Sequence, residues 1–326
     1  MRAKTCVVCL SPILFLYGSM RIALPQQNAQ PAPTLKDHIA SELKFIEEAP
    51  SQHATDLQLA RLWGHLAVDY HDNGDVQLSE EAYSRSLALL QKIPSAQSDY
   101  ATALANLASL YIETSRIQEA ENCKRKELVV RESMDDVSGA AQARSELAAI
   151  LVNQHKYKEA EQQSLSALNA IEKQQGGNTI DIVATLLPLA YARCLQRRCK
   201  EALADAHRAV NLIDSVFSTH SSPQTGPAWL VGGAHLTFGY TQWKTGDTTD
   251  ADTSMREALQ IFRSQPDLPH AVLRWGLVQY SDFLKATHKK AEAKQLNNEI
   301  TRLTNDELRD CRNCTIDVHA YSNALW

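Results

Sequence analysis

Glycine and proline are scarce in this chain of 326 residues, which contains 12 glycines and 11 prolines. A β-rich fold needs many tight turns, and these two residues commonly supply them, so their scarcity argues against an all-β fold. A large excess of one charge is also lacking, because the formal net charge is −5. Nucleic-acid-binding domains carry a basic patch, and peripheral membrane segments carry basic runs, so neither kind of partner is expected.

Catalytic and cofactor motifs that can be recognised by their spacing are absent as well. The sequence has no His-Glu-x2-His zinc motif, no Walker phosphate loop, no Gly-x-Gly-x2-Gly fingerprint and no nucleophile elbow. Its 11 histidines are scattered without the spacing of metal ligands. The sequence therefore predicts a protein that is not an enzyme and that holds no cofactor and no metal ion.

The first thirty residues differ from the rest of the chain. Arg2 and Lys4 make a positive start, residues 6–17 form an apolar stretch, and a segment rich in Gln and Pro follows. This order is typical of a secretory signal peptide, and the apolar stretch is too short for a spanning helix of about 20 residues. We therefore expect residues 1–30 to be a signal peptide and linker, and the protein to be exported, periplasmic or secreted. An uncleaved anchor or a disordered tail is the alternative.

The seven cysteines are too few for a disulfide scaffold in a chain of this length. Cys311-x2-Cys314 is the most suggestive pair, and it fits a small structural disulfide, two free thiols or a redox centre. The pair lacks a strand-to-helix setting, so a thiol oxidoreductase is the least favoured of these alternatives. Cys194 and Cys199 lie across the end of a predicted helix, where they either form a bridge or only pack.

A repeated pattern occupies most of the chain. Its first two copies read Trp63-x2-Leu66-Ala67-x2-Tyr70 and Leu104-x2-Leu107-Ala108-x2-Tyr111. The small residue that opens the second half of each copy falls at Ser79, Ala120, Ala160, Ala202, Ala251 and Ala293. Apolar residues three and four apart lie on one face of a helix, and short polar segments between the halves predict antiparallel helical hairpins. One hairpin cannot cover its own apolar face, so the copies must stack.

The pattern resembles the tetratricopeptide repeat, whose signature is Trp-x2-Leu-Gly-x2-Tyr followed by Ala. Most intervals are near 42 residues, which is similar to the longer repeats of kinesin light chains. Two runs match that form: Ala105-Asn106-Leu107-Ala108 and Glu119-Ala120-Glu121. The resemblance implies an all-α fold, a right-handed α-solenoid of about six stacked helical hairpins. It is imperfect, because Arg193 and Gln242 replace the aromatic residue of the signature.

The pattern also sets the expected domain limits. Residues 34–55 contain an amphipathic helix that caps the first repeat, residues 56–304 form the solenoid, and residues 305–326 form a tail. The longest interval between repeats places an inserted loop around residues 218–227. Pro188 falls inside a predicted helix and should kink it, because proline lacks a backbone donor.

The first helix of each pair lines a concave face in tetratricopeptide solenoids, and this face is the usual binding surface. The family geometry implies that large side chains of the later copies point into it: Leu187, Tyr191, Leu236, Tyr240, Trp243 and Trp275. Rigid aromatic side chains are common interface anchors, so the resemblance implies a scaffold or adaptor for a protein or peptide partner. Two structural alternatives are that these residues belong to the core, or that residues 305–326 fill the groove. An envelope-assembly or chaperone factor is a second functional hypothesis.

Overall fold

The described part of the chain is helical. The computed structural model describes residues 34–49, 51, 53–174, 179–217, 228–265, 268 and 270–310. These residues form thirteen α-helices and one short 3-10 helix, and they contain no β-strand. The expected signal segment, the expected loop at residues 218–227 and the pair Cys311 and Cys314 lie outside the described residues.

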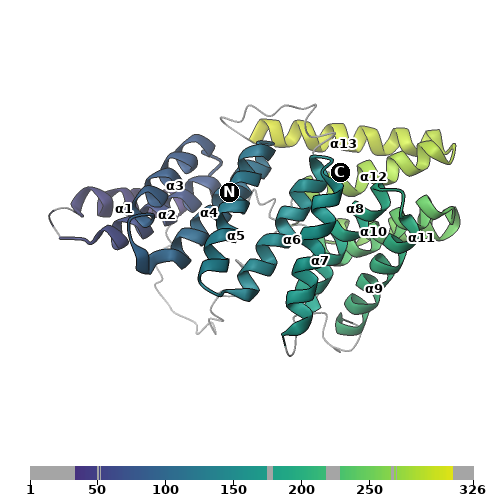
Figure 1. Cartoon of the computed structure of the whole chain (residues 1–326). Coiled ribbons are helices and arrows are strands. Elements are labelled where there is room, and N and C mark those ends of the chain that lie inside the picture. Colours follow the sequence, from purple (N-terminus) through teal and green to yellow (C-terminus); the bar gives the residue numbers. More distant parts are fainter. Residues whose placement is uncertain are drawn as a thin grey trace, which may run out of the picture.

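The helices after the first one follow one another in antiparallel pairs (Figure 1). Helix α1 (Leu35–Glu48) precedes the pairs, and a 3-10 turn (Pro94–Ala96) lies between the first two. The pairs are α2 (Asp56–Asp72) with α3 (Val76–Leu90), α4 (Gln97–Glu113) with α5 (Ile117–Ser133), α6 (Val137–Asn153) with α7 (Tyr157–Lys173), α8 (Thr179–Leu195) with α9 (Cys199–Phe217), α10 (Ala228–Thr245) with α11 (Thr248–Arg263), and α12 (His270–Ala286) with α13 (Lys290–Asp310). These six hairpins stack side by side, which confirms the predicted all-α fold of stacked helical hairpins.

Small residues allow the two helices of each hairpin to approach closely. The six residues that open the second halves of the copies are all fully or almost fully buried: Ser79, Ala120, Ala160, Ala202, Ala251 and Ala293. Ser79 also donates a hydrogen bond of 2.7 Å from its hydroxyl to the carbonyl oxygen of Ala67 on the partner helix. A larger side chain at these positions would push the helices apart, since protein interiors are already close-packed.

Every hairpin turns through one residue with a left-handed backbone. These residues are Gly74, Ser115, His155, Arg197, Gly246 and His288, with φ between 59° and 101°. Glycine adopts this conformation freely, whereas the other four residues carry a Cβ that disfavours it. The turn geometry is therefore imposed by the packing of the helices rather than by the preference of the turn residue.

An ionic tie recurs between neighbouring hairpins. In each case the residue just before the second helix of a hairpin is a lysine or arginine. It forms an ion pair with an acidic residue of the preceding hairpin, and this acidic residue is the fifth residue of that hairpin's second helix. The ties are Arg116 to Glu80 at 2.5 Å, Lys156 to Glu121 at 2.8 Å, Arg198 to Glu161 at 2.8 Å and Lys289 to Asp252 at 3.2 Å. Between the fourth and fifth hairpins, Leu203 and Asp247 occupy the two positions. Apolar residues of α9, α8 and α10 form a common core cluster at that boundary instead.

Helix α8 contains Pro188 and continues without a break from Thr179 to Leu195, and the kink at this proline stays a prediction. Proline has no N–H to donate to the carbonyl group four residues earlier, which belongs to Ala184. The hydroxyl of Ser145 on α6 donates to that carbonyl oxygen at 3.2 Å. The neighbouring helix α6 thus supplies the hydrogen bond that the proline cannot make.

Helices α1 and α13 form the two ends of the array. Helix α1 packs against α2, yet none of its residues is fully buried, and Leu43 and Phe45 are exposed. Helix α13 continues to Asp310, beyond residue 304, where the repeats were expected to end. Among the described residues, no helix combines the length and the apolar character that crossing a membrane requires.

Candidate functional site

The large side chains predicted for the concave face come together on α8, α10 and α12, which are the first, or inner, helices of their hairpins. The ring centres of Tyr191 and Tyr240 lie 4.9 Å apart, and those of Tyr191 and Trp275 lie 6.3 Å apart. The rings of Trp243 and Tyr240 are nearly perpendicular, with their centres 6.1 Å apart. The sequence pattern therefore identified a real aromatic cluster that joins three successive hairpins.

The members of this cluster differ in burial, and therefore in how accessible they are to a ligand. Leu236 is 0% exposed and Tyr191 is 1% exposed, so these two side chains lie inside the protein. Leu187, Tyr240 and Trp275 retain a small exposed area, and Trp243 is only partly buried. Of the six predicted residues, Trp243 offers the largest surface to a partner, and the predicted role of the set in binding stays a prediction.

A lysine follows Trp243 directly and covers its ring. The Nζ atom of Lys244 lies 3.4 Å from the ring centre of Trp243 and 5.3 Å from that of Tyr240. Burial lowers the pKa of Lys244, and the charge of Asp282 on α12 opposes that shift. The exposed rim of the aromatic cluster thus carries a cation held on an aromatic face. The groove positions of the family geometry had not included this lysine.

Inner helices α2 and α4 form the other end of the face, and polar contacts join them. Arg61 and Asp99 form an exposed ion pair of 2.9 Å. His71 Nε2 lies 2.5 Å from Glu113 Oε2, and both side chains are nearly buried. Burial tends to lower the pKa of His71, but the charge of Glu113 prevails and raises it. This end of the face is therefore polar and only partly buried, in contrast to the aromatic end.

A family comparison identifies the first two hairpins. Residues 58–133 match the family model of the tetratricopeptide repeat. This part of the chain carries tetratricopeptide repeats. No curated protein matches the sequence.

Solved structures share the fold of the tetratricopeptide array at low sequence identity. The apo form of RapI has a TM-score of 0.67 with 15% identity, covering 85% of this chain and 92% of its own. A tetratricopeptide repeat protein from Parabacteroides merdae has a TM-score of 0.56 with 16% identity, covering 89% and 97%. A Rap protein complexed with Competence and Sporulation Factor has a TM-score of 0.50 with 13% identity, covering 82% and 76%. At these identities the likeness shows the fold, and the kinesin-light-chain form of the repeats stays a prediction.

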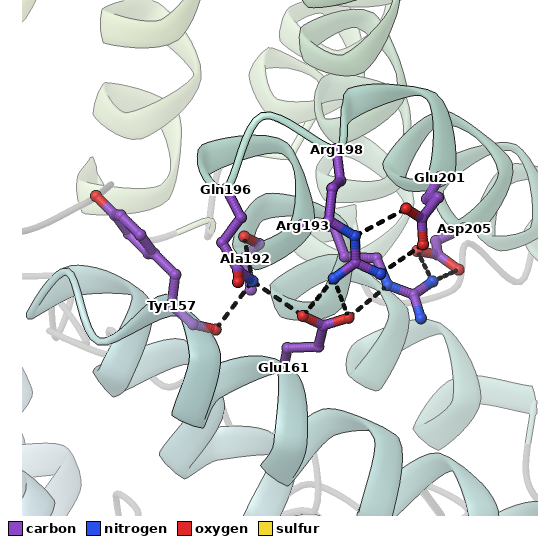
Figure 2. Close-up of polar contacts among 8 residues, drawn as sticks. All are labelled: Tyr157, Glu161, Ala192, Arg193, Gln196, Arg198, Glu201 and Asp205. Atoms are coloured by element: carbon purple, nitrogen blue, oxygen red, sulfur yellow. Dashed lines mark hydrogen bonds and ion pairs between the residues drawn. The ribbon is translucent and has the colours of Figure 1, made fainter.

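Arg193 departs from the aromatic residue of the tetratricopeptide signature, and the structure gives the reason. Its guanidinium donates to Glu161 on α7 at 3.0 Å and forms an ion pair of 2.7 Å with Asp205 on α9. Figure 2 shows Arg193, Gln196 and Arg198 converging on Glu161. Burial raises the pKa of the Glu161 carboxyl, but the hydrogen bonds from these three residues outweigh it and lower the pKa. The charged network thus occupies the position of an aromatic contact between repeats.

A buried charged group lies between the second and third hairpins. The Lys124 ammonium on α5 is fully enclosed and binds Glu127 at 2.8 Å and Glu146 of α6. Burial tends to lower the pKa of Lys124, but the charges of Glu146 and Glu127 prevail and raise it. The sequence pattern did not identify this group, although a charged side chain on the buried face of α5 was a visible signal.

The fourth hairpin contains a disulfide. Cys194 at the end of α8 and Cys199 at the start of α9 are joined, with an Sγ–Sγ distance of 2.08 Å. Of the two alternatives that the sequence left open for this pair, the structure contains the bridge. Cys123 is a buried free thiol in the described part of the chain, and burial raises its pKa to about 11.

Among the described residues, no group of three or more His, Cys, Asp or Glu side chains is placed to hold a metal ion. The features that distinguish the concave side are therefore the aromatic cluster with Lys244 at one end and the polar contacts of α2 and α4 at the other.

Proposed function

We propose that this chain is a non-catalytic scaffold or adaptor that holds a protein or peptide on its concave face. The observation that carries the proposal is the continuous stack of six hairpins, in which the inner helices offer one extended surface. Arrays of this kind bind partners on their concave surface and have the fold of the Rap protein that was solved with Competence and Sporulation Factor. The partner in that complex is not carried over to this chain, for which we propose a protein or peptide partner.

The aromatic end of the face is the proposed anchor point. Trp243 is the least buried of the six predicted contact residues, and Lys244 extends the surface with a positive charge. A partly buried tryptophan beside a cation is a common kind of binding hot spot. A partner segment with an apolar side chain and a nearby acidic group would satisfy both residues.

Affinity capture from the native host with a matched pair of variants tests this proposal. Trp243→Ala is expected to reduce recovery of the specific partner by about tenfold or more, which is the range of an interface hot spot. Trp229→Ala is the control, because Trp229 is also a partly buried tryptophan of α10 but packs in a different core cluster. Equal recovery with the two variants would remove Trp243 from the binding surface. Circular dichroism of both variants establishes that they fold.

Export of the protein is part of the proposal. It is supported by the order of basic, apolar and polar segments in residues 1–30 and by the disulfide of the fourth repeat, since disulfides persist mainly in oxidising compartments. A fusion of residues 1–30 to alkaline phosphatase, which is active only after export, is expected to be active. An inactive fusion that is made in normal amount would contradict export.

An envelope-assembly or chaperone factor is the second form of the same proposal. A scaffold is expected to retain one folded partner with a fixed stoichiometry, whereas a chaperone would retain several unfolded clients. Mass spectrometry of the captured proteins distinguishes the two.

A further inference from the structure

The disulfide of the fourth hairpin lies within the network that joins this hairpin to the third. Cys194 directly follows Arg193, and Cys199 directly follows Arg198. The bond therefore links the two chain positions whose neighbouring guanidinium groups both bind Glu161 of α7. Figure 2 shows both arginines reaching the same carboxylate.

The turn enclosed by the disulfide carries a third contact to the preceding hairpin. The Gln196 side chain donates to Glu161 at 2.9 Å and lies 3.5 Å from the carbonyl oxygen of Tyr157. Arg197, the next residue, has a left-handed backbone with φ of 65°. A non-glycine residue disfavours this conformation, so a covalent link across the turn helps to maintain the geometry in which the three donors point at Glu161.

The other hairpins have no such link at the corresponding positions. Ile112 and Ile117 occupy them in the second hairpin, and Val152 and Tyr157 occupy them in the third. The fourth hairpin thus has a covalent bond where its neighbours have side-chain packing alone. Cys194 also belongs to the core cluster that contains Tyr191 and Tyr240, so the bond borders the aromatic end of the concave face.

We infer that the Cys194–Cys199 pair is a redox-responsive clasp, that is, a disulfide whose closure controls how rigidly the third and fourth hairpins are held together. The interface between these two hairpins is called the joint. With the bond closed, Arg193, Gln196 and Arg198 are held on Glu161. With the bond open, the turn fluctuates more, and the contacts to α7 open more often. The inference does not depend on the proposed partner, because it concerns the coupling of two hairpins within the chain.

The chemistry of the clasp is ordinary thiol–disulfide exchange. On closing, a thiolate of the pair attacks glutathione disulfide to form a mixed disulfide, and the second cysteine then displaces glutathione. Over the two steps the Sγ–Sγ bond of the pair forms and the disulfide bond of glutathione disulfide breaks. The two cysteine thiols lose two electrons and two protons, which convert glutathione disulfide into two glutathione thiols. Cys199 is partly exposed while Cys194 is buried, so exchange with a small thiol begins at Cys199.

Mass spectrometry of the full chain establishes the bond first. The chain is equilibrated with glutathione disulfide, its free thiols are blocked with N-ethylmaleimide, and the digest is analysed without reduction. The peptide that contains Cys194 and Cys199 is expected to be unlabelled and lighter by two hydrogens than its reduced form. Labelling of both cysteines in the oxidised folded chain would overturn the inference.

Hydrogen exchange of the oxidised and reduced full chain then tests the joint. Reduction is expected to raise exchange about tenfold at residues 193–201 and in the first turns of α7, consistent with the loss of a short cross-link and with local opening. The α4–α5 turn, which contains no cysteine, is the internal control and should not change. Unchanged exchange in α7, or a change confined to the α8–α9 turn, would overturn the inference.

A variant of the shared carboxylate separates the clasp from a general loosening of the fold. Glu161→Gln weakens the ionic contacts while the disulfide remains, so α7 of this variant should exchange faster when oxidised. Reduction should then add less than about twofold to its exchange in α7, because coupled perturbations are not additive. A full additional increase would show that the bond acts independently of Glu161 and would contradict the mechanism. The wild-type chain in reductant provides the reduced state without a cysteine substitution.

Discussion

Two glycines of α10, Gly239 and Gly233, allow a test of whether α10 and α11 must pack closely in the fifth hairpin. A Cβ atom added at Gly239 would lie 3.1 Å from the carbonyl oxygen of Ala251 and 3.1 Å from the backbone nitrogen of Met255. Backbone atoms of α11 cannot rotate away, so the helices would have to separate. A Cβ atom at Gly233 would meet first the Leu187 Cδ1 atom at 3.3 Å, which is the end of a flexible side chain.

The expected energies follow from two opposing effects. Alanine is about 1 kcal/mol more favourable than glycine in a helix interior, and this gain is common to both sites. Overpacking of a tight contact costs about 1 to 3 kcal/mol, and this cost applies to Gly239→Ala. The free energy of unfolding should therefore be about 1 to 3 kcal/mol lower for Gly239→Ala than for Gly233→Ala.

Urea unfolding followed by circular dichroism measures this difference, with the wild type as reference. Helix propensity cancels between the two variants because both glycines lie in the interior of the same helix. Equal free energies of unfolding, or a more stable Gly239→Ala variant, would show that the close packing of α10 against α11 does not require glycine at position 239.

Four further substitutions test individual contacts. Ser145→Ala should lower the free energy of unfolding by about 1 kcal/mol, since it leaves the Ala184 carbonyl without a donor, and urea unfolding measures this. Lys124→Met should cost about 3 to 5 kcal/mol by the same assay, because the Glu146 carboxylate stays buried without a cation and Glu127 keeps only its ion pair with Arg131. His155→Gly should raise the melting temperature, because glycine relieves the left-handed turn, and a decrease would contradict this. The raised pKa of His71 predicts a contribution to stability that is present at acidic pH and lost as pH rises through that pKa; His71→Gln should flatten this pH dependence.

The hairpins could be predicted from the sequence because their main determinants are local. Ser79 and the five alanines recur at one position of each copy, and helix crossing requires a small residue there. The approximate limits of the helices follow from the same spacing. Arg193 was recognised as a departure from the pattern, but its partners Glu161 and Asp205 belong to other helices and could not be assigned from the spacing alone.

The degree of burial on the concave side could not be predicted in the same way. Whether Tyr191 contacts a ligand or the core depends on how far successive inner helices lie from one another, and a repeat pattern does not specify that distance. The same holds for Lys124, whose two carboxylate partners come from α5 and α6. Both features depend on the relative placement of hairpins, whereas the pattern describes each hairpin by itself.

The interrupted series of ionic ties implies that the joints of the array respond differently to solvent. Concentrated salt screens partly exposed charge pairs, so it should weaken the four joints that have a tie. It should strengthen the packing between the fourth and fifth hairpins, where Leu203 replaces the acidic residue, because salting-out ions favour apolar burial. Changes of ionic environment would then redistribute bending along the molecule without altering its helix content, and the curvature of the array would become a property of the surrounding medium as well as of the sequence.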